Sequence, residues 1–264
     1  DVPGLYEAFG TPEFDEMYMK YENAYSVPKT KINARELITD LLKERAETGR
    51  IYIMNIDHSN THSSFKDKVN MSNLCQEITL PTDPIQSIEG EGEIALCILS
   101  AINVGIVKEE EMESLCELAV RGLEELIDFQ EYPVKAAEVS TKGRRSLGIG
   151  YIGLAHFLAK NKVKYSDPEA LKLVHELTER FQFYLLKASN QIAKEKGACD
   201  YYHRTKYSNG VLPIDTYKQE VDELVKPVYN MDWETLRKDI KEHGVRHSTL
   251  TAQMPSESSS VVSN

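Results

Sequence analysis

The apolar run at residues 94–104 constrains the fold of this chain more than any other stretch. Nearly all of its residues (IALCILSAINV) are apolar, so it lacks the alternation expected of a strand with one face in water. Runs of this kind are typical of strands buried on both faces, which occur mainly in parallel sheets. We therefore predict a buried parallel strand here, preceded by a turn at residues 90–93.

The rest of the chain alternates between predicted helices and strands. Apolar side chains at helical spacing predict two long helices, at residues 109–132 and 166–196. Pro133 follows the first, and the second begins with the capping-box pattern Ser166 to Glu169 and is followed by Gly197. Shorter helices are predicted at 4–21, 32–48, 213–225 and 232–243, strands at 50–56 and 246–253, and a loop at 58–69. This order predicts an α/β protein with a largely parallel sheet or barrel.

Composition limits the classes of function. The chain has 264 residues, 41% of them hydrophobic, which suffices for one large domain or two modest ones. Its net charge of −11 argues against broad binding to nucleic acids or membrane surfaces. No signal peptide and no apolar run of about 18 residues is recognisable, and four cysteines are too few for a disulfide scaffold. We therefore expect a cytoplasmic protein with reduced thiols.

The segment at residues 73–77 (NLCQE) is the strongest candidate for a reactive site. In an extended segment side chains alternate, so Asn73, Cys75 and Glu77 would project from one side. A thiol beside a hydrogen-bonding amide and a carboxylate base is chemically competent, whereas a structural cysteine needs neither neighbour. The local pattern fits a core cysteine on a loop equally well. Cys97 is a second thiol, within the predicted buried strand.

The run at residues 255–260 (PSESSS) is a second candidate site. A strand that ends in small hydroxyl residues at the start of a helix presents free backbone N–H groups, which can bind an anion. Composition alone favours a plain serine cap or a disordered tail. His58 and His62 with Cys75 do not complete a four-ligand set, so we expect hydrogen-bonded or solvated loop histidines and no metal.

A glycine pattern, two further cysteines and a pair of arginines are expected to have structural roles. The GIGYIG pattern at 148–153 has the spacing of dinucleotide-binding turns, but no buried strand precedes it and no acidic residue follows at the expected distance. We expect its glycines to allow close backbone packing. Cys116 lies on a helix stripe and is expected in the core, while Cys199 follows a helix end with no visible partner. Arg144 and Arg145 are expected at a surface or interface.

Six stretches of the sequence resemble one protein family. They are SNLCQEITLP, EIALCILSAINVG, GRRSLGIG, FYLLKASNQIAKEKGAC, GVLPIDTYK and STLTAQMPSESSS. In this order they resemble the large, catalytic subunit of aerobic class I ribonucleotide reductases, and the resemblance covers nearly the whole chain. The family's large subunit is much longer, so the chain resembles its middle-to-late catalytic portion.

The resemblance implies an α/β fold that is part of a ten-stranded barrel made of two five-stranded halves. Residues 1–56 are expected to end the first half-barrel, 57–92 to form the finger loop region, and 93–264 to form the second half-barrel with the phosphate-binding segment. The strand at 51–56 would close the first half, and the strand at 94–104 would open the second. Such a piece alone would expose strand edges and apolar surface, so we expect poor solubility without the rest.

The resemblance also implies thiyl-radical reduction of ribonucleoside diphosphates to their 2′-deoxy forms, for DNA precursor synthesis. Cys75 would form the thiyl radical that removes the ribose 3′ hydrogen, and Glu77 would accept the 3′-hydroxyl proton. Asn73 would orient the substrate hydroxyls, and Cys97 would be one half of the dithiol that supplies the electrons. The phosphates and ribose would be bound by Pro255, Ser256, Glu257, Ser258 and Ser259.

The family pattern implies partners outside this chain. No cofactor is expected on the chain itself: the radical would come from a metal-containing small subunit, and nucleotide effectors (ATP and dNTPs) would bind elsewhere in the full large subunit. A second large subunit and thioredoxin or glutaredoxin are also expected, with no membrane or direct nucleic-acid contact. The family's partner for Cys97 lies before Asp1, and its tyrosine pair and C-terminal cysteine pair lie after Asn264. The chain by itself is therefore not expected to turn over.

Two alternatives are open at this point. A cobalamin-dependent reductase shares the finger-loop cysteine but needs no radical-donating subunit, and the long motif matches favour class I over it. The other alternative is a non-catalytic assembly piece of a split reductase. The joint presence of Asn73, Cys75, Glu77 and Cys97 argues against that reading.

Overall fold

The computed structural model describes residues 2–87, 89, 92–224 and 226–263, which fall into two compact units. The first unit, residues 1–61, is helical, and the second, residues 62–264, contains the sheet. The turn predicted at 90–93 lies partly outside the described residues. No helix among the described residues is both long and apolar enough to cross a membrane.

The first unit is built from helices. They are α1 (Leu5–Ala8), α2 (Glu13–Asn23), α3 (Ala34–Thr48) and the start of α4 (Ile56–His62). The Asn33 side chain accepts hydrogen bonds from two backbone N–H groups of the first turn of α3, and Gly49 ends that helix with a φ of 65°. The helix predicted at 32–48 is confirmed. The helix predicted at 4–21 is instead two helices, because Gly10 turns the chain between them with a φ of 77°.

The strand predicted at residues 50–56 is wrong. Residues 51–55 have no regular structure and α4 begins at Ile56, so the loop predicted at 58–69 is also helical in its first part. A strand needs a neighbour for its backbone N–H and C=O groups. None of the described residues pairs with this run, and the side chains of Tyr52 and Ile53 are 51% and 54% exposed.

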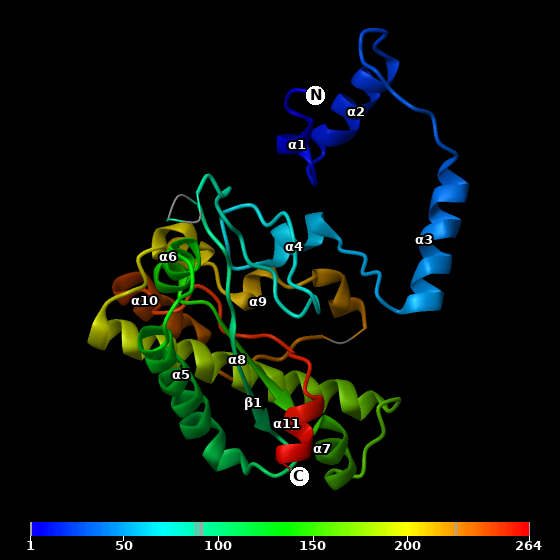
Figure 1. The fold of residues 1–264 in the computed structure, drawn as a ribbon. Helices are drawn as coiled ribbons and strands as arrows, with labels where there is room; N and C mark the ends of the chain where they lie inside the picture. The colour runs from blue at the N-terminus through cyan, green and yellow to red at the C-terminus, as the bar shows by residue number, and fades with distance from the viewer. Residues whose placement is uncertain (1, 88, 90–91, 225, 264) are drawn as a thin grey trace. The chain divides into compact units, whose positions relative to one another are not determined.

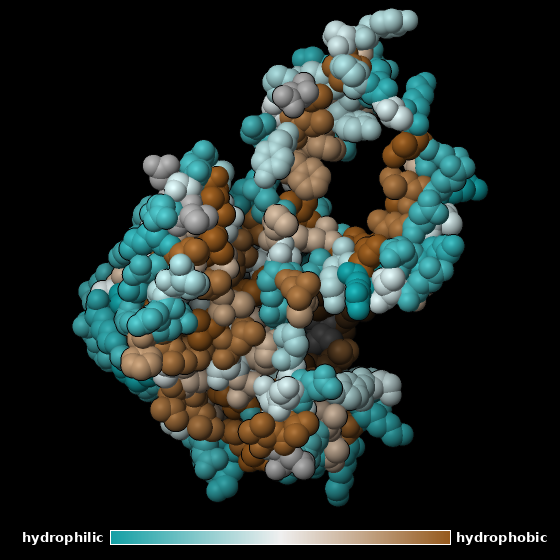
Figure 2. Space-filling view, in the orientation of Figure 1, coloured by the Kyte–Doolittle hydropathy of each residue, from teal (hydrophilic) through white to brown (hydrophobic). Residues whose placement is uncertain are grey.

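An apolar stripe on α3 is uncovered. Leu37, Ile38 and Leu42 are each about half exposed, and hydrophobic surface runs along one face of α3 in Figure 2. Neither α2 nor α3 contains a buried residue. Because most helix stability comes from packing an apolar face, this unit gains little stability from a core of its own.

Two parallel strands form the centre of the second unit. β1 (Ile98–Asn103) pairs with β2 (Leu147–Ile152) in register from Ile98 opposite Leu147 to Asn103 opposite Ile152 (Figure 1). The parallel strand predicted from the apolar run is therefore confirmed, over a shorter span. Its predicted burial on both faces is wrong, since Leu99 is 38% exposed while Ile102 is buried.

The segment predicted as a strand at 246–253 lies along the free edge of β2. The backbone N–H groups of Leu147 and Ile149 donate to the carbonyls of Thr249 and Leu250, at 3.1 and 2.8 Å. A single parallel bridge joins Ile149 and Thr251. The placement beside the sheet agrees with the prediction, but the pairing is too short for a full strand.

Two long helices supply most of the core. α5 (Met112–Phe129) packs against both strands and along α8 (Pro168–Lys196) (Figure 1). Their buried apolar residues include Cys116, Val120, Leu123, Ile127, Leu177, Phe181 and Leu185. The core position predicted for Cys116 is confirmed. The predicted capping box is wrong: Asp167 is the N-cap of α8, and its carboxylate accepts the N–H of Lys164 instead.

The remaining helices surround this core. They are α6 (Lys135–Arg144), α7 (Leu154–Lys160), α9 (Pro213–Thr216), α10 (Trp233–His243) and α11 (Glu257–Val262). The predicted helix at 232–243 is confirmed, with Asp232 as its N-cap and Gly244 after it. The single helix predicted at 213–225 is wrong, because α9 ends at Thr216 and a separate 3₁₀ turn follows at Gln219–Glu223.

The surface position predicted for Arg144 and Arg145 is wrong. Their side chains are 1% and 5% exposed and are paired with carboxylates. Arg144 donates to Glu93, and Arg145 donates to Glu124. Charged side chains are rarely buried unless they are paired. The carboxylates lie 51 and 21 residues away along the chain, so the dipeptide alone cannot reveal them.

The glycines of β2 allow a close approach of backbone, which confirms the interpretation of the GIGYIG pattern. A methyl group on Gly150 would lie 2.3 Å from the carbonyl oxygen of Ala252. A methyl group on Gly148 would lie 2.5 Å from Cδ2 of Leu99. Both distances are far below van der Waals contact, so the neighbouring segments pack where a side chain would stand.

Gly150→Ala is expected to destabilise the protein by about 1–3 kcal/mol, because a backbone carbonyl cannot move aside as a side chain can. The matched control is Gly122→Ala in α5, where nothing lies within 4 Å of the added methyl. That variant is expected to stabilise by about 0.5–1 kcal/mol, since alanine favours a helix over glycine. Urea unfolding of both variants measures the difference, and the same sign for both would contradict the packing described.

Candidate functional site

Cys75 lies in a tight turn. The N–H of Gln76 donates to the carbonyl of Asn73 at 3.3 Å, and Gln76 has a left-handed φ of 58°. The segment is therefore not extended, and the alternation that would place Asn73, Cys75 and Glu77 on one side does not apply to it. The thiol of Cys75 is exposed, which also excludes the alternative of a core cysteine.

The side chain of Asn73 accepts hydrogen bonds within this turn. Its Oδ1 accepts hydrogen bonds from the N–H of Ile78 and the hydroxyl of Ser72, both at 3.4 Å. Short amide side chains commonly bond to nearby backbone in this way and so stabilise turns. Ile78 is buried and anchors the end of the turn.

Glu77 and Cys97 come together beside β1. Burial raises the pKa of the Cys97 thiol, and the nearby charge of Glu77 raises it further. Cys97 immediately precedes β1 and is partly buried. Oε2 of Glu77 is buried and has no hydrogen-bond partner among the described residues. Leaving such an oxygen unsatisfied costs about 1–3 kcal/mol, so this carboxylate is poised to accept a hydrogen bond from a bound molecule.

Cys75 and Glu77 line one cavity of about 570 Å³. Its wall is formed by Ile149 and Tyr151 of β2 and by residues 251–253, and α8 contributes Gln182. The cavity therefore joins the turn, the sheet and the segment that leads into residues 255–260. Sequence reasoning missed Tyr151 and Gln182, because the first lies in a pattern of glycines and the second beside the apolar stripe of a helix.

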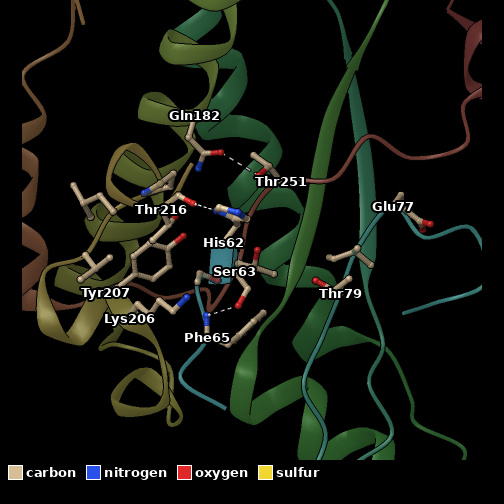
Figure 3. Close-up of a pocket in the computed structure, with 16 residues that line it drawn as sticks. His62, Ser63, Phe65, Glu77, Thr79, Gln182, Lys206, Tyr207, Thr216 and Thr251 are labelled. Carbon is tan, nitrogen blue, oxygen red and sulfur yellow. Dashed lines mark hydrogen bonds between the residues drawn. The ribbon is translucent and has the colours of Figure 1, made fainter. Parts of the chain in front are cut away.

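A smaller polar cavity of about 210 Å³ adjoins the first and shares Glu77, Gln182 and Thr251 with it (Figure 3). The hydroxyl of Thr251 donates to Gln182 at 3.0 Å, and the ring of His62 bonds to the carbonyl of Thr216. In Figure 3 the carboxylate of Glu77 points away from these side chains. Within the described part of the chain, no group of three or more His, Cys, Asp and Glu side chains could hold a metal ion.

The segment predicted to bind phosphate begins a helix. Ser256 is the N-cap of α11 but makes no capping hydrogen bond through its side chain. Pro255, Glu257, Ser258 and Ser259 are exposed, and none of them lines either of the two cavities around Glu77. The far end of α11 lies at the carboxyl end of β1, where Asn103 donates to the carbonyl of Ser263 at 3.3 Å. The predicted helix start is confirmed, and anion binding stays a prediction.

The other two cysteines are not available for chemistry. Cys116 and Cys199 are buried, and burial raises the pKa of each thiol to about 12. Thiols of such high pKa are poor nucleophiles at neutral pH because the thiolate is scarce. Cys75 and Cys97 are therefore the two thiols that the fold leaves accessible.

Glu77→Gln is expected to speed alkylation of Cys97 by about two- to fivefold near pH 8, because removing the adjacent negative charge lowers the thiol pKa. Iodoacetamide labelling followed by peptide mass spectrometry measures the rate. Glu117→Gln, on the exposed face of α5, is the matched control and is expected to leave the rate unchanged. An unaltered Cys97 rate in the Glu77 variant would show that the two groups do not interact.

The family model of the ribonucleotide reductase barrel domain matches residues 1–264, the whole chain. The chain is 55% identical over 271 residues to ribonucleoside-diphosphate reductase subunit alpha of Haemophilus influenzae, and 52% identical to subunit alpha of reductase 1 of Escherichia coli. Both alignments cover 100% of this chain and 36% of the relative. The alpha subunit of phage T4 is 45% identical, over 95% of this chain and 33% of the relative.

The chain thus spans about a third of the length of these relatives. The family match extends over every element described above, including the turn with Cys75, the parallel strands and α11. The mixed helix and sheet structure with parallel strands agrees with part of an α/β barrel. On this basis the chain belongs to the family of ribonucleotide reductase barrel domains.

Proposed function

We propose that this chain holds the site at which a class I ribonucleotide reductase converts ribonucleoside diphosphates to 2′-deoxyribonucleoside diphosphates. The observation that carries the proposal is the buried, unpartnered carboxylate oxygen of Glu77, a residue that lines the same cavity as Cys75 and whose charge raises the pKa of the Cys97 thiol. A base with an unfilled hydrogen-bond position next to two accessible thiols suits a substrate hydroxyl undergoing redox chemistry.

The proposed reaction begins at Cys75. Its thiyl radical removes the 3′ hydrogen of the ribose, and Glu77 accepts the 3′-hydroxyl proton, which assists loss of the 2′-hydroxyl as water. Two electrons from a dithiol reduce the sugar, and the 3′ hydrogen returns from Cys75, which regenerates the thiyl radical. Overall, one diphosphate and two thiols give one deoxynucleoside diphosphate, one disulfide and one water.

Cys97 is the proposed member of the reducing dithiol. Its raised pKa keeps it a neutral thiol near pH 7, so it can donate a proton to the leaving hydroxyl as well as electrons. Cys116 and Cys199 are buried free thiols in this structure, and neither is proposed as its partner. The second thiol is therefore proposed to come from another segment of the enzyme.

Substrate binding is proposed for two segments. Asn73 would orient the hydroxyls of the ribose from the turn that carries Cys75. The phosphates and ribose would be bound by Pro255, Ser256, Glu257, Ser258 and Ser259. The start of a helix leaves backbone N–H groups unsatisfied, and these suit phosphate oxygens.

The proposed partners follow from this chemistry. A metal-containing small subunit would supply the radical, and thioredoxin or glutaredoxin would reduce the disulfide. A second large subunit would complete a dimer, and nucleotide effectors would bind elsewhere in the subunit, all in the cytoplasm. Residues 1–56, 57–92 and 93–264 would correspond to the end of the first half-barrel, the finger loop region and the second half-barrel.

The test is product formation by the holoenzyme that contains this chain, supplied with its small subunit, a dithiol reductant and CDP. We expect dCDP, identified by chromatography against a standard. The Haemophilus influenzae reductase serves as the positive control for the assay. Absence of deoxy product under conditions where the control is active would contradict the proposal.

A further inference from the structure

We propose that Arg144 and Arg204 are positioning residues that clamp both ends of the segment carrying Cys75 and so set where the thiol lies. The inference depends on the proposed function only for its kinetic readout, because the clamp itself is a matter of geometry. Neither arginine touches the cavity that Cys75 lines. Both act through carboxylates on the chain before and after the turn.

The first end of the segment is held at Asp67. Its carboxylate accepts from Arg144 at 2.9 Å and from Nε of Arg204 at 2.6 Å. The backbone joins the same two regions, since the N–H of Lys66 donates to the carbonyl of Arg204 at 2.9 Å. An antiparallel bridge between Phe65 and Thr205 extends this contact.

The second end is held by the same two arginines. Arg204 donates to both oxygens of Asp83, at 2.8 and 2.7 Å, and Arg144 donates to both oxygens of Glu93, at 2.9 and 2.7 Å. The N–H of Asp83 also donates to Glu93 at 2.8 Å. Bidentate pairs of this kind fix both distance and orientation. Each arginine therefore joins one carboxylate before Cys75 to one after it.

The ring of Tyr201 lies against the guanidinium groups of both arginines. Its centroid lies 5.1 Å from the guanidinium carbon of Arg144 and 5.0 Å from that of Arg204. Contacts of guanidinium groups with an aromatic ring restrict their planes. The side chains of Arg144 and Glu93 are 1% and 2% exposed, whereas those of Arg204 and Asp83 are 21% and 49% exposed. The Arg144 pair is therefore shielded from water, and shielding strengthens an ion pair.

The turn between these ends has few contacts of its own. In the described structure, the hydrogen bonds of residues 72–78 remain within the turn, from Gln76 to Asn73 and between Asn73, Ser72 and Ile78. The side chains of Val69, before the turn, and of Ile78, at its end, are buried. The placement of the turn relative to β1 and β2 therefore depends on where the two clamped ends lie.

Arg204 is the residue to substitute, because its partial exposure makes loss of the fold less of a risk than at Arg144. In the holoenzyme, Arg204→Ala is expected to speed hydrogen exchange at residues 68–82 by about tenfold while α5 exchanges as before. With CDP, kcat is expected to fall by about 10- to 100-fold with KM within about twofold. Arg204→Lys is expected to recover only part of the loss, because a single ammonium cannot reproduce the bidentate contact with Asp83 together with the contact to Asp67.

The matched control is Arg237→Ala. Arg237 also makes a bidentate pair, with Asp215, and its side chain is 18% exposed, but it does not contact the segment that carries Cys75. It is expected to leave exchange at 68–82 and kcat unchanged. Equal exchange at 68–82 in the two alanine variants, or faster exchange across α5 as well, would overturn the clamp. An inactive parent enzyme would instead count against the proposed function. The comparison of hydrogen exchange at residues 68–82 would still show whether Arg204 holds the segment in place.

Discussion

Cys75→Ser is expected to abolish diphosphate reduction by the holoenzyme, a loss of at least about 10³-fold in kcat, with substrate binding retained. A thiol S–H bond is close in strength to the activated C–H bond of the ribose, so the sulfur radical can remove and return hydrogen. A serine hydroxyl has a much stronger O–H bond and cannot take this role. The substitution is nearly isosteric at an exposed position of the turn, so the fold is expected to survive.

The two readouts for this variant are the rate of dCDP formation and the affinity for CDP by calorimetry. Met71→Ala is the matched control, because Met71 is exposed in the same segment but outside the turn. It is expected to retain reduction. Turnover by Cys75→Ser at a rate near that of the parent would eliminate the radical role of Cys75.

The second large predicted effect is a loss of stability when the buried carboxylate Glu124 is substituted. This carboxylate is 1% exposed and accepts from Arg145 and Arg246 at 2.7 Å each and from His247 at 3.0 Å. Burial alone would raise the pKa of Glu124, but the hydrogen bonds from His247, Arg145 and Arg246 outweigh it and hold the pKa well below its usual range. Nδ1 of His247 is bonded in turn to the hydroxyl of Ser189 at 2.9 Å. The network ties α5, α8 and the segment beside β2 together.

Glu124→Ala is expected to lower the free energy of unfolding by about 3–5 kcal/mol, because it removes the buried carboxylate that pairs with Arg246 and leaves Arg145 with Asp128 alone. For a domain of this size, that corresponds to a fall in Tm of about 10 °C. The comparison is Glu195→Ala, which removes an equally well-formed bidentate pair with Arg121 at the surface. That variant is expected to melt close to the parent, since solvent screens exposed pairs. Similar Tm values for the two variants would contradict a central role for Glu124.

Local sequence signals predicted the parts of the fold that depend on local physics. The apolar run at 94–104 indicated β1. The strand β2 was not predicted, and only close backbone packing was expected of its glycines at 148 and 150. Periodicity and end signals located α5, α8 and α10, because an amphipathic stripe and a terminal glycine act within a few residues of each other. The strand predicted at 50–56 failed because pairing depends on a neighbour elsewhere in the protein.

The sequence singled out candidate site residues, but it did not predict how they are arranged. The pattern around Cys75 identified Asn73 and Glu77, yet the turn depends on the left-handed conformation of Gln76, which no local signal requires. The closeness of Glu77 to Cys97 and the pairing of Arg144 with Glu93 depend on contacts 20 and 51 residues apart. Long-range pairing of this kind is set by the whole fold, so sequence reasoning placed the buried arginines at the surface.

The most direct test of the central claim, that Cys75 removes the 3′ hydrogen, is competition between CDP carrying deuterium at the 3′ position and ordinary CDP in the holoenzyme. We expect the deuterated substrate to be consumed more slowly and its deuterium to be found at the 3′ position of the product. Equal consumption of the two substrates, with the 3′ deuterium replaced completely by solvent hydrogen, would contradict it.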